Sequence, residues 1–154
     1  MSLNITMNFE GLEETYKAIE QLSTESELKD INKKIIKKAG KIAKEEATGQ
    51  IRKKAYSKNP MKSGWKGSRT GQHAADNVPE KGKTQKGNYA EIIGWDISDN
   101  SPFFYMKFQE WGTSNAPIQK AKKFMLETAH VTYQQLKAIA EEEYETVLKE
   151  KLGE

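Results

Sequence analysis

Residues 100–117 read NSPFFYMKFQEWGTSNAP, and this stretch holds most of the aromatic density of the chain. Five aromatic residues fall within nine positions, one acid lies inside the apolar run, and a glycine follows it directly. A short apolar run of this kind is compatible with either a strand or a short buried helix. Because glycine adopts a positive φ without a steric penalty, Gly112 marks the place where the apolar element ends in a polar turn.

The acid inside this run, Glu110, is a candidate for a buried carboxylate because apolar residues surround it in the sequence. Burial disfavours the charged form of a carboxyl group unless a cation or backbone amides hold it. We therefore interpret Glu110 as a structural acceptor. It takes hydrogen bonds from the turn at Gly112 and Thr113, or it pairs with a basic residue of the same or a neighbouring subunit. No second catalytic group accompanies it in the sequence, which disfavours a role as a general base.

The residues outside this stretch predict an α+β fold. Residues 3–9 alternate apolar and polar side chains, as in a strand with one buried face, and residues 89–97 show a second strand pattern. Apolar residues recur at helical spacing over 12–22, over 28–51 and from about 123 to 152. We expect a single domain, residues 1–154, in which two to three helices pack on a small, mostly antiparallel sheet and the C-terminal helix is long.

Residues 57–88 separate the second helix from the second strand pattern and lack a hydrophobic period. Ser, Gly, Lys, Asn and Pro dominate them, and Trp65 and Val78 are the strongly apolar residues. An unstructured segment of roughly 30 residues is uncommon in a compact domain and is usually functional or disordered. We expect a flexible basic loop here. Together with the C-terminal helix, whose acidic end projects or packs on a neighbour, it carries subunit or partner contacts.

The net charge of +3 is unevenly distributed. Residues 1–30 carry a net charge of −5, residues 31–86 carry +12, and residues 87–154 carry −4. This asymmetry favours either a surface that faces nucleic acid or head-to-tail pairing between subunits. The residues that we expect at such a subunit or DNA contact are Lys37, Lys41, Lys44, Arg52, Lys53, Lys66, Arg69, Lys81 and Lys83.

Several classes of chemistry are disfavoured by composition. The chain has no cysteine, which excludes disulfides, thiol catalysis and cysteine-based zinc sites. Its two histidines, His73 and His130, lack the spacing of metal ligands, and no nucleophile-elbow pattern is present, so we expect no cofactor, no metal and no enzyme activity. The start MSLNITMNF lacks a charged segment and an apolar core, so we expect no signal peptide. No apolar run approaches the roughly 18 residues of a membrane span.

The order of the motifs resembles the tail-component or tail-completion family of siphovirus-type phages and prophages, often called gene-product-ten-like. The resemblance covers nearly the whole chain and rests mainly on FYMKFQEWGTSNAP, residues 104–117. An Arg-Thr-Gly motif precedes the sheet, where the family often continues with Leu-Arg and this chain has Gln72 and His73. The residues that carry the resemblance are Glu110, Trp111, Gly112 and Thr113, with Thr70 and Gly71.

The resemblance implies a structural virion protein that completes the tail, or joins head and tail, at the neck of the particle. It implies assembly into a ring rather than catalysis, with further copies of the chain and other neck or tail proteins as partners. Weak, non-specific DNA contact is compatible with it, and we expect no membrane and no small-molecule substrate. The expected location is the virion, and the host bacterial cytoplasm during assembly.

The residues themselves leave one alternative, a nucleic-acid-binding module. In that interpretation the basic side chains of residues 33–86 contact phosphates, and Trp65 stacks on a base. Such a module binds duplex DNA with micromolar or tighter affinity and loses that affinity steeply with salt.

Overall fold

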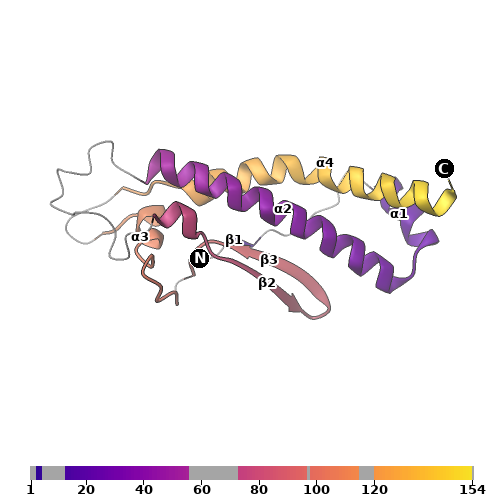
Figure 1. The fold of residues 1–154 in the computed structure, drawn as a ribbon, viewed down its shortest axis with the longest axis horizontal. Coiled ribbons are helices and arrows are strands. Elements are labelled where there is room, and N and C mark those ends of the chain that lie inside the picture. Colours follow the sequence, from indigo (N-terminus) through magenta and orange to yellow (C-terminus); the bar gives the residue numbers. More distant parts are fainter. Residues whose placement is uncertain (1–2, 5–12, 56–72, 97, 115–119, 154) are drawn as a thin grey trace.

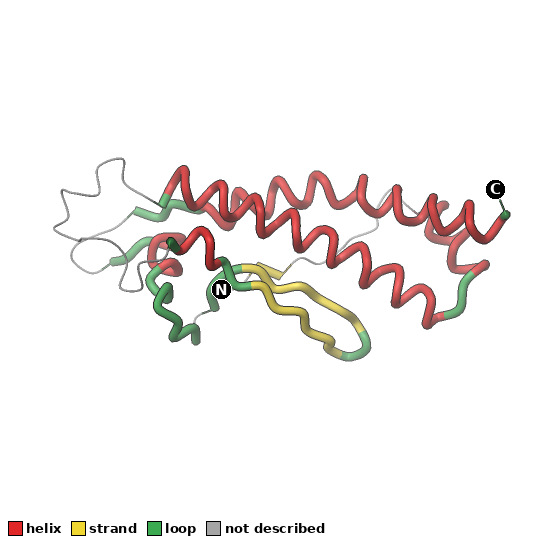
Figure 2. The backbone as a smooth tube through the Cα atoms, viewed as in Figure 1, coloured by secondary structure: helices red, strands yellow, loops and turns green. Residues whose placement is uncertain are grey.

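The computed structural model describes residues 3–4, 13–55, 73–96, 98–114 and 120–153 of the chain. Helices make up most of the described structure, and a small antiparallel sheet completes it, which confirms the predicted α+β class (Figures 1 and 2). The elements in chain order are β1 (Leu3–Asn4), α1 (Glu13–Leu22), α2 (Glu25–Lys54), the 3-10 helix η2 (Ala74–Asn77), β2 (Glu80–Gln85), β3 (Asn88–Ile93), α3 (Met106–Trp111) and α4 (Phe124–Leu152).

The two long helices, α2 and α4, lie side by side and antiparallel, and α1 sits beside the C-terminal end of α4 (Figure 1). α2 begins at a capping box, in which Thr24 and Glu27 accept hydrogen bonds from each other's backbone N–H groups. The buried Tyr144 donates from its hydroxyl to Asn32 Oδ1 at 2.7 Å, which joins α4 to α2. The core between the three helices contains Ile19, Ile35, Ala39, Leu136, Ile139, Ala140 and Tyr144.

A second core lies at the other end of the helix pair. There the C-terminal half of α2 and the first turn of α4 meet η2, the sheet and α3 (Figure 1). Its alanines lie on α2 and η2, and its larger side chains come from α2, β3, α3, α4 and the segments between these elements. The principal members are Ala43, Ala47, Ile51, Val78, Ile93, Trp95, Phe103, Met106 and Phe124.

The sheet has the order β1-β3-β2, and both pairings are antiparallel. Glu91 and Ile93 are buried, and Glu91 faces Gly40 of α2 so closely that an added Cβ on Gly40 would lie 2.6 Å from Glu91 Cγ. Residues opposite each other in an antiparallel pair point to the same face, and successive residues point to opposite faces. Because Lys81 pairs with Ile92 and Lys83 with Ala90, these two lysines lie on the face away from α2.

The prediction of a loop over 57–88 is wrong for its second half. Residues 73–88 hold η2, β2 and the turn into β3, whereas 57–72 lie outside the described residues. All six residues of β2 are exposed, and the strand is held by its backbone pairing with β3. A strand that buries no side chain has no hydrophobic period, which is why the pattern gave no sign of it.

The second predicted strand is shorter than its pattern. β3 ends at Ile93 because Gly94 adopts a φ of +105° and donates its N–H to Pro79 O at 2.9 Å. Trp95 is nevertheless buried, since the chain turns back into the core after the strand. Ile97 and most of the first predicted strand, residues 5–9, lie outside the described residues.

One interpretation of the length of the C-terminal helix was that its acidic end projects from the body. The structure instead packs this part of α4 against α2. Glu143 of α4 is only 3% exposed and forms ion pairs with Lys34, at 2.7 Å, and with Lys38, both on α2. Burial acts to raise the pKa of Glu143, but the hydrogen bonds from the two lysines outweigh it and hold the pKa below its ordinary value of 4.5. Part of the predicted attraction between the basic middle and the acidic end therefore operates within one chain.

We expect Glu143→Gln to lower the free energy of unfolding at neutral pH by about 1–2 kcal/mol, because the paired charge is lost at a buried position. A carboxyl group whose folded pKa is depressed stabilises the fold above its unfolded pKa and loses that contribution as pH falls through the folded value. Urea unfolding below about pH 4.5 therefore shows a steeper loss for the unmodified chain than for the variant. The exposed neighbour Glu142→Gln is the control, and equal pH dependence in all three proteins would contradict the ion pair.

Candidate functional site at the α3–α4 junction

The aromatic stretch that begins at residue 100 forms a turn followed by the short helix α3. Asp99 begins it by accepting from the backbone N–H of Ser101 at 3.1 Å and from its hydroxyl at 2.7 Å. The helix ends at Gly112, which has a φ of +78° and donates its N–H to Phe108 O at 2.8 Å. The apolar run is thus a helix, and the predicted glycine stop is confirmed.

Glu110 is buried, as predicted, and its carboxylate completes the start of α4. Glu110 Oε2 accepts from the backbone N–H of Met125 at 2.9 Å, and Oε1 accepts from that of Leu126 at 3.2 Å. Lys123, at the N-cap position, has a φ of +51° and makes no capping hydrogen bond with its side chain. A carboxylate from another helix therefore satisfies the first-turn amides and the positive end of the dipole.

These partners differ from the predicted ones. One predicted partner of Glu110 was the turn at Gly112 and Thr113, and the other was a basic residue of the same or a neighbouring subunit. The Gly112 N–H is used inside α3, and the carboxylate accepts from amides 15 and 16 residues along the chain. Every non-proline residue has a backbone N–H donor, so the sequence does not indicate which of these donors will form a hydrogen bond with a given carboxylate. Glu110 thus accepts hydrogen bonds from backbone amides, as one of the two alternatives had it, but these amides belong to α4 and not to the turn.

The segment before α4 joins three helices at one point. The backbone N–H of Lys122 donates to Gln109 O at 2.9 Å, and that of Lys123 donates to Glu110 O at 3.3 Å. The side chain of Lys122 turns to the end of α2 and donates from Nζ to Ala55 O at 3.0 Å. A cation at a helix C-terminus is favoured by the dipole, while burial lowers the pKa of Lys122.

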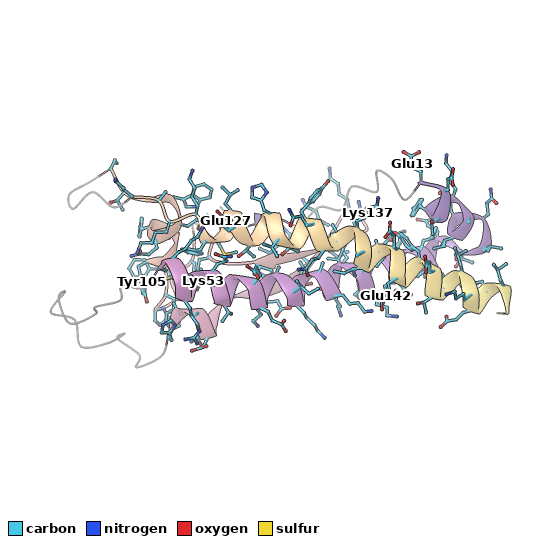
Figure 3. The ribbon with its side chains drawn as sticks, turned by 90° about the horizontal axis from the view of Figure 1, so that it is seen from above. Glu13, Lys53, Tyr105, Glu127, Lys137 and Glu142 are labelled. Atoms are coloured by element: carbon cyan, nitrogen blue, oxygen red, sulfur yellow. The ribbon has the colours of Figure 1, made fainter. Side chains whose placement is uncertain are left out.

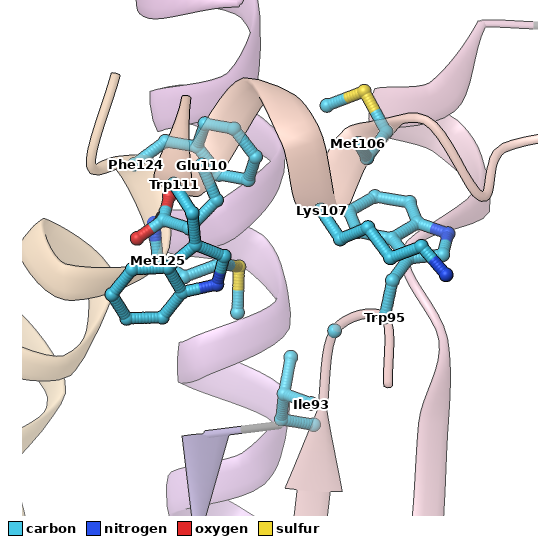
Figure 4. Close-up of a pocket in the computed structure, with 9 residues that line it drawn as sticks. Ile93, Trp95, Met106, Lys107, Glu110, Trp111, Phe124 and Met125 are labelled. Carbon is cyan, nitrogen blue, oxygen red and sulfur yellow. Dashed lines mark hydrogen bonds between the residues drawn. The ribbon is translucent and has the colours of Figure 1, made fainter. Parts of the chain in front are cut away.

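A small hollow lies beside this junction (Figure 4). Its volume is about 10 Å³, which is enough for about one water molecule. Each oxygen of Glu110, which borders the hollow, accepts one backbone amide of α4. The residues around the hollow include Ile93, Trp95, Lys107, Glu110, Trp111 and Met125.

The solvent side of α3 carries an aromatic face formed by Phe104, Phe108 and Trp111. Phe104 lies in the turn just before the helix, and Trp111 also borders the hollow. The exposed fractions of the three residues are 40%, 44% and 56%. The spacing of four and three residues places them on one side of the helical segment. The rings of Phe104 and Phe108 meet edge to face with centroids 6.3 Å apart, and Lys107 Nζ lies 5.7 Å from the Phe108 centroid.

The described basic residues of the predicted subunit or DNA contact lie on α2 and β2. Lys44 pairs with Glu80 at 3.0 Å and Arg52 pairs with Asp76. Lys37 lies over the ring of Tyr89, with Nζ 5.9 Å from the centroid, and Lys41 and Lys53 are exposed on α2. Lys81 and Lys83 are on the far side of the sheet from α2. Lys66, Arg69, Thr70 and Gly71 lie outside the described residues.

Tyr89, Glu91 and Lys33 form a polar cluster between α2 and the sheet that was not predicted from the sequence. Tyr89 donates from its hydroxyl to the buried Glu91 at 2.5 Å, and this hydrogen bond raises the pKa of Tyr89 to about 12. Lys33 Nζ lies 5.5 Å from the Tyr89 centroid. The one available signal was Gly40, a glycine in the middle of a long helix, which allows Glu91 to approach the helix backbone.

No family model matches this chain, and no curated protein or solved structure matches it either. Within the part of the chain that the structure describes, no three His, Asp or Glu side chains come together as a metal site. No helix among those same residues is both long and apolar enough to cross a membrane. Exposed aromatic side chains gather on the aromatic face of α3, whose buried side is anchored to α4 by Glu110.

Proposed function

We propose that this chain is a structural virion protein of a phage or prophage, which completes the tail or joins head and tail at the neck. It acts by assembling with further copies into a ring and with other neck or tail proteins, not by catalysis. The observation that supports this proposal is the aromatic face of α3, which belongs to the motif that carries the resemblance. Exposed aromatic clusters mark interaction sites, and aromatic residues supply much of the energy of protein contacts.

The way α3 is held also suits an assembly role. Met106 and Glu110 fix the inner side of the helix in the core and on the amides of α4, while Phe108 and Trp111 point away from it. The aromatic face is therefore held in place before any partner arrives. Such preorganisation lowers the conformational entropy that binding would otherwise cost.

We expect the molar mass from light scattering to rise with protein concentration to that of a closed oligomer, without DNA. The double variant Phe108→Ser/Trp111→Ser is expected to need at least tenfold higher concentration to assemble, because two exposed aromatic anchors are lost. Tyr133→Ser is the matched control, since Tyr133 is an exposed aromatic residue of α4, with 63% exposure, outside the motif.

The same experiment with added duplex DNA tests the alternative. Lys33, Lys37 and Lys41 recur every fourth residue and are exposed on α2, which is the observation that favours a nucleic-acid-binding module. A chain that stays monomeric at all concentrations, binds duplex at low salt and releases it at high salt would establish that alternative instead.

A further inference from the structure

We infer that copies of this chain bind one another head to tail, the aromatic end of one copy contacting the acidic end of the next. This inference rests on the proposed function, because it names the surfaces that the ring would use. The aromatic end comprises Phe104, Phe108, Trp111, Lys53, Lys120 and Lys123, and the acidic end comprises Leu22, Leu152, Glu20, Glu145 and Glu150.

The two ends lie far apart on an elongated molecule. α3 and the start of α4 are at one end of the long axis, and α1 and the C-terminus are at the other (Figure 1). Viewed from above, Lys53 and Tyr105 lie toward the first end, and Glu13 and Glu142 toward the second (Figure 3). One copy therefore cannot bring its own two ends together, and both remain available to neighbours.

Each end exposes apolar side chains that a contact would cover. At the acidic end, Leu22 closes α1 and is 44% exposed, and Leu152 closes α4 and is 61% exposed. The ion pair of Lys151 with Glu27, at 2.7 Å, holds the end of α4 against the start of α2, just after α1. Leucines of this kind are suitable partners for the aromatic side chains of α3.

The exposed charged side chains differ in sign between the two ends, being basic at the aromatic end and mainly acidic, with Lys149 among them, at the other. Lys53, Lys120 and Lys123 are exposed and form no ion pair within the described residues, whereas their neighbours Arg52 and Lys54 are already paired with Asp76 and Glu127. Glu20, Glu145 and Glu150 are likewise exposed and make no ion pair in that part of the chain.

The charges favour a head-to-tail contact between copies over a contact between two aromatic ends. A contact between two aromatic ends brings six lysines together and is opposed by like-charge repulsion, whereas a head-to-tail contact pairs lysines with glutamates. A head-to-tail contact is heterologous, so its repetition closes into a ring or continues as a filament. Each copy then uses both ends, which is what a ring subunit requires.

Two variants test this inference by complementation. Phe108→Ser/Trp111→Ser disables the aromatic end, and Glu145→Lys/Glu150→Lys disables the acidic end. We expect each variant alone to be monomeric at concentrations where the unmodified chain assembles. An equimolar mixture has one intact end of each kind, so we expect its mass by light scattering to double and then stop at a one-to-one dimer. Far-UV circular dichroism and thermal unfolding check that both variants fold.

The other outcomes are distinguishable. If the acidic-end variant assembles like the unmodified chain and the mixture forms no dimer, the head-to-tail inference is wrong, while assembly through the aromatic face stands. If the unmodified chain is monomeric at every concentration, the inference and the ring proposal both fail. If the aromatic-end variant unfolds, Lys120→Glu/Lys123→Glu replaces it, because it alters only exposed side chains at that end. This protein is expected to assemble poorly alone and to assemble with the acidic-end variant, since opposite charges then meet at every contact between the two.

Discussion

Replacing Glu110 with alanine is expected to lower the free energy of unfolding by about 2–3 kcal/mol, among the largest single-residue effects predicted for this chain. The substitution removes two hydrogen bonds to the first turn of α4 and leaves the buried N–H of Met125 without its acceptor. Loss of an N-cap acceptor costs about 0.5–2 kcal/mol, and an unsatisfied buried donor costs about 1–3 kcal/mol. Urea unfolding followed by far-UV circular dichroism measures the difference.

Two further variants separate the roles of the carboxylate. Glu110→Gln retains one oxygen acceptor but no charge, so we expect it to lose about 1 kcal/mol, less than the alanine variant. Glu45→Ala, an exposed position on α2, is the control and is expected to stay within about 0.5 kcal/mol of the unmodified chain. If Glu110→Ala behaves like Glu45→Ala, the carboxylate does not hold α4.

Replacing Gly40 with alanine is expected to destabilise the protein by about 1–2 kcal/mol, although alanine is the better helix former. The new Cβ would lie 2.6 Å from Cγ and 3.3 Å from Cβ of the buried Glu91. Relief of that overlap costs about 1–3 kcal/mol, which exceeds the gain of up to about 1 kcal/mol in helix propensity. Thermal and urea unfolding both report the change.

The same helix provides a matched control for Gly40. A Cβ added at Gly49 has no neighbouring heavy atom within 4 Å, so Gly49→Ala is expected to stabilise the chain by about 0.5–1 kcal/mol. The two substitutions are chemically identical and differ only in what faces the glycine. Equal effects at the two positions would show that Glu91 does not press against α2.

The helices and the fold class were predictable because burial is periodic along them. The stripe from Leu28 to Ile51 and the repeat after residue 123 each follow the 3.6-residue period, and α2 and α4 fall where those patterns lie. The stop at Gly112 was predictable for a different reason, since the φ it adopts is one that glycine takes without strain.

The parts that sequence reasoning missed are those held by backbone or by pairs distant along the chain. β2 buries no side chain, and Glu110 reaches amides of a different helix, so neither leaves a local pattern. Glu143 lies three residues after Ala140, on the buried stripe of α4, and its position did carry a signal. Because Glu143 lies in a run of acids, we expected this end of the helix to project or to pack on a neighbour. The carboxylate of Glu143 instead pairs with lysines of α2.

The composition of strand β2 bears on how the sheet resists aggregation. β2 is one of the two outer strands and carries Lys81 and Lys83 on alternate positions, with Lys86 in the turn beyond it. Adding a second β2 edge to edge would crowd these ammonium groups and strip their hydration, so lysines on an edge strand oppose aggregation. Lysines in these positions therefore oppose growth of the sheet along its hydrogen-bonding direction at the β2 edge.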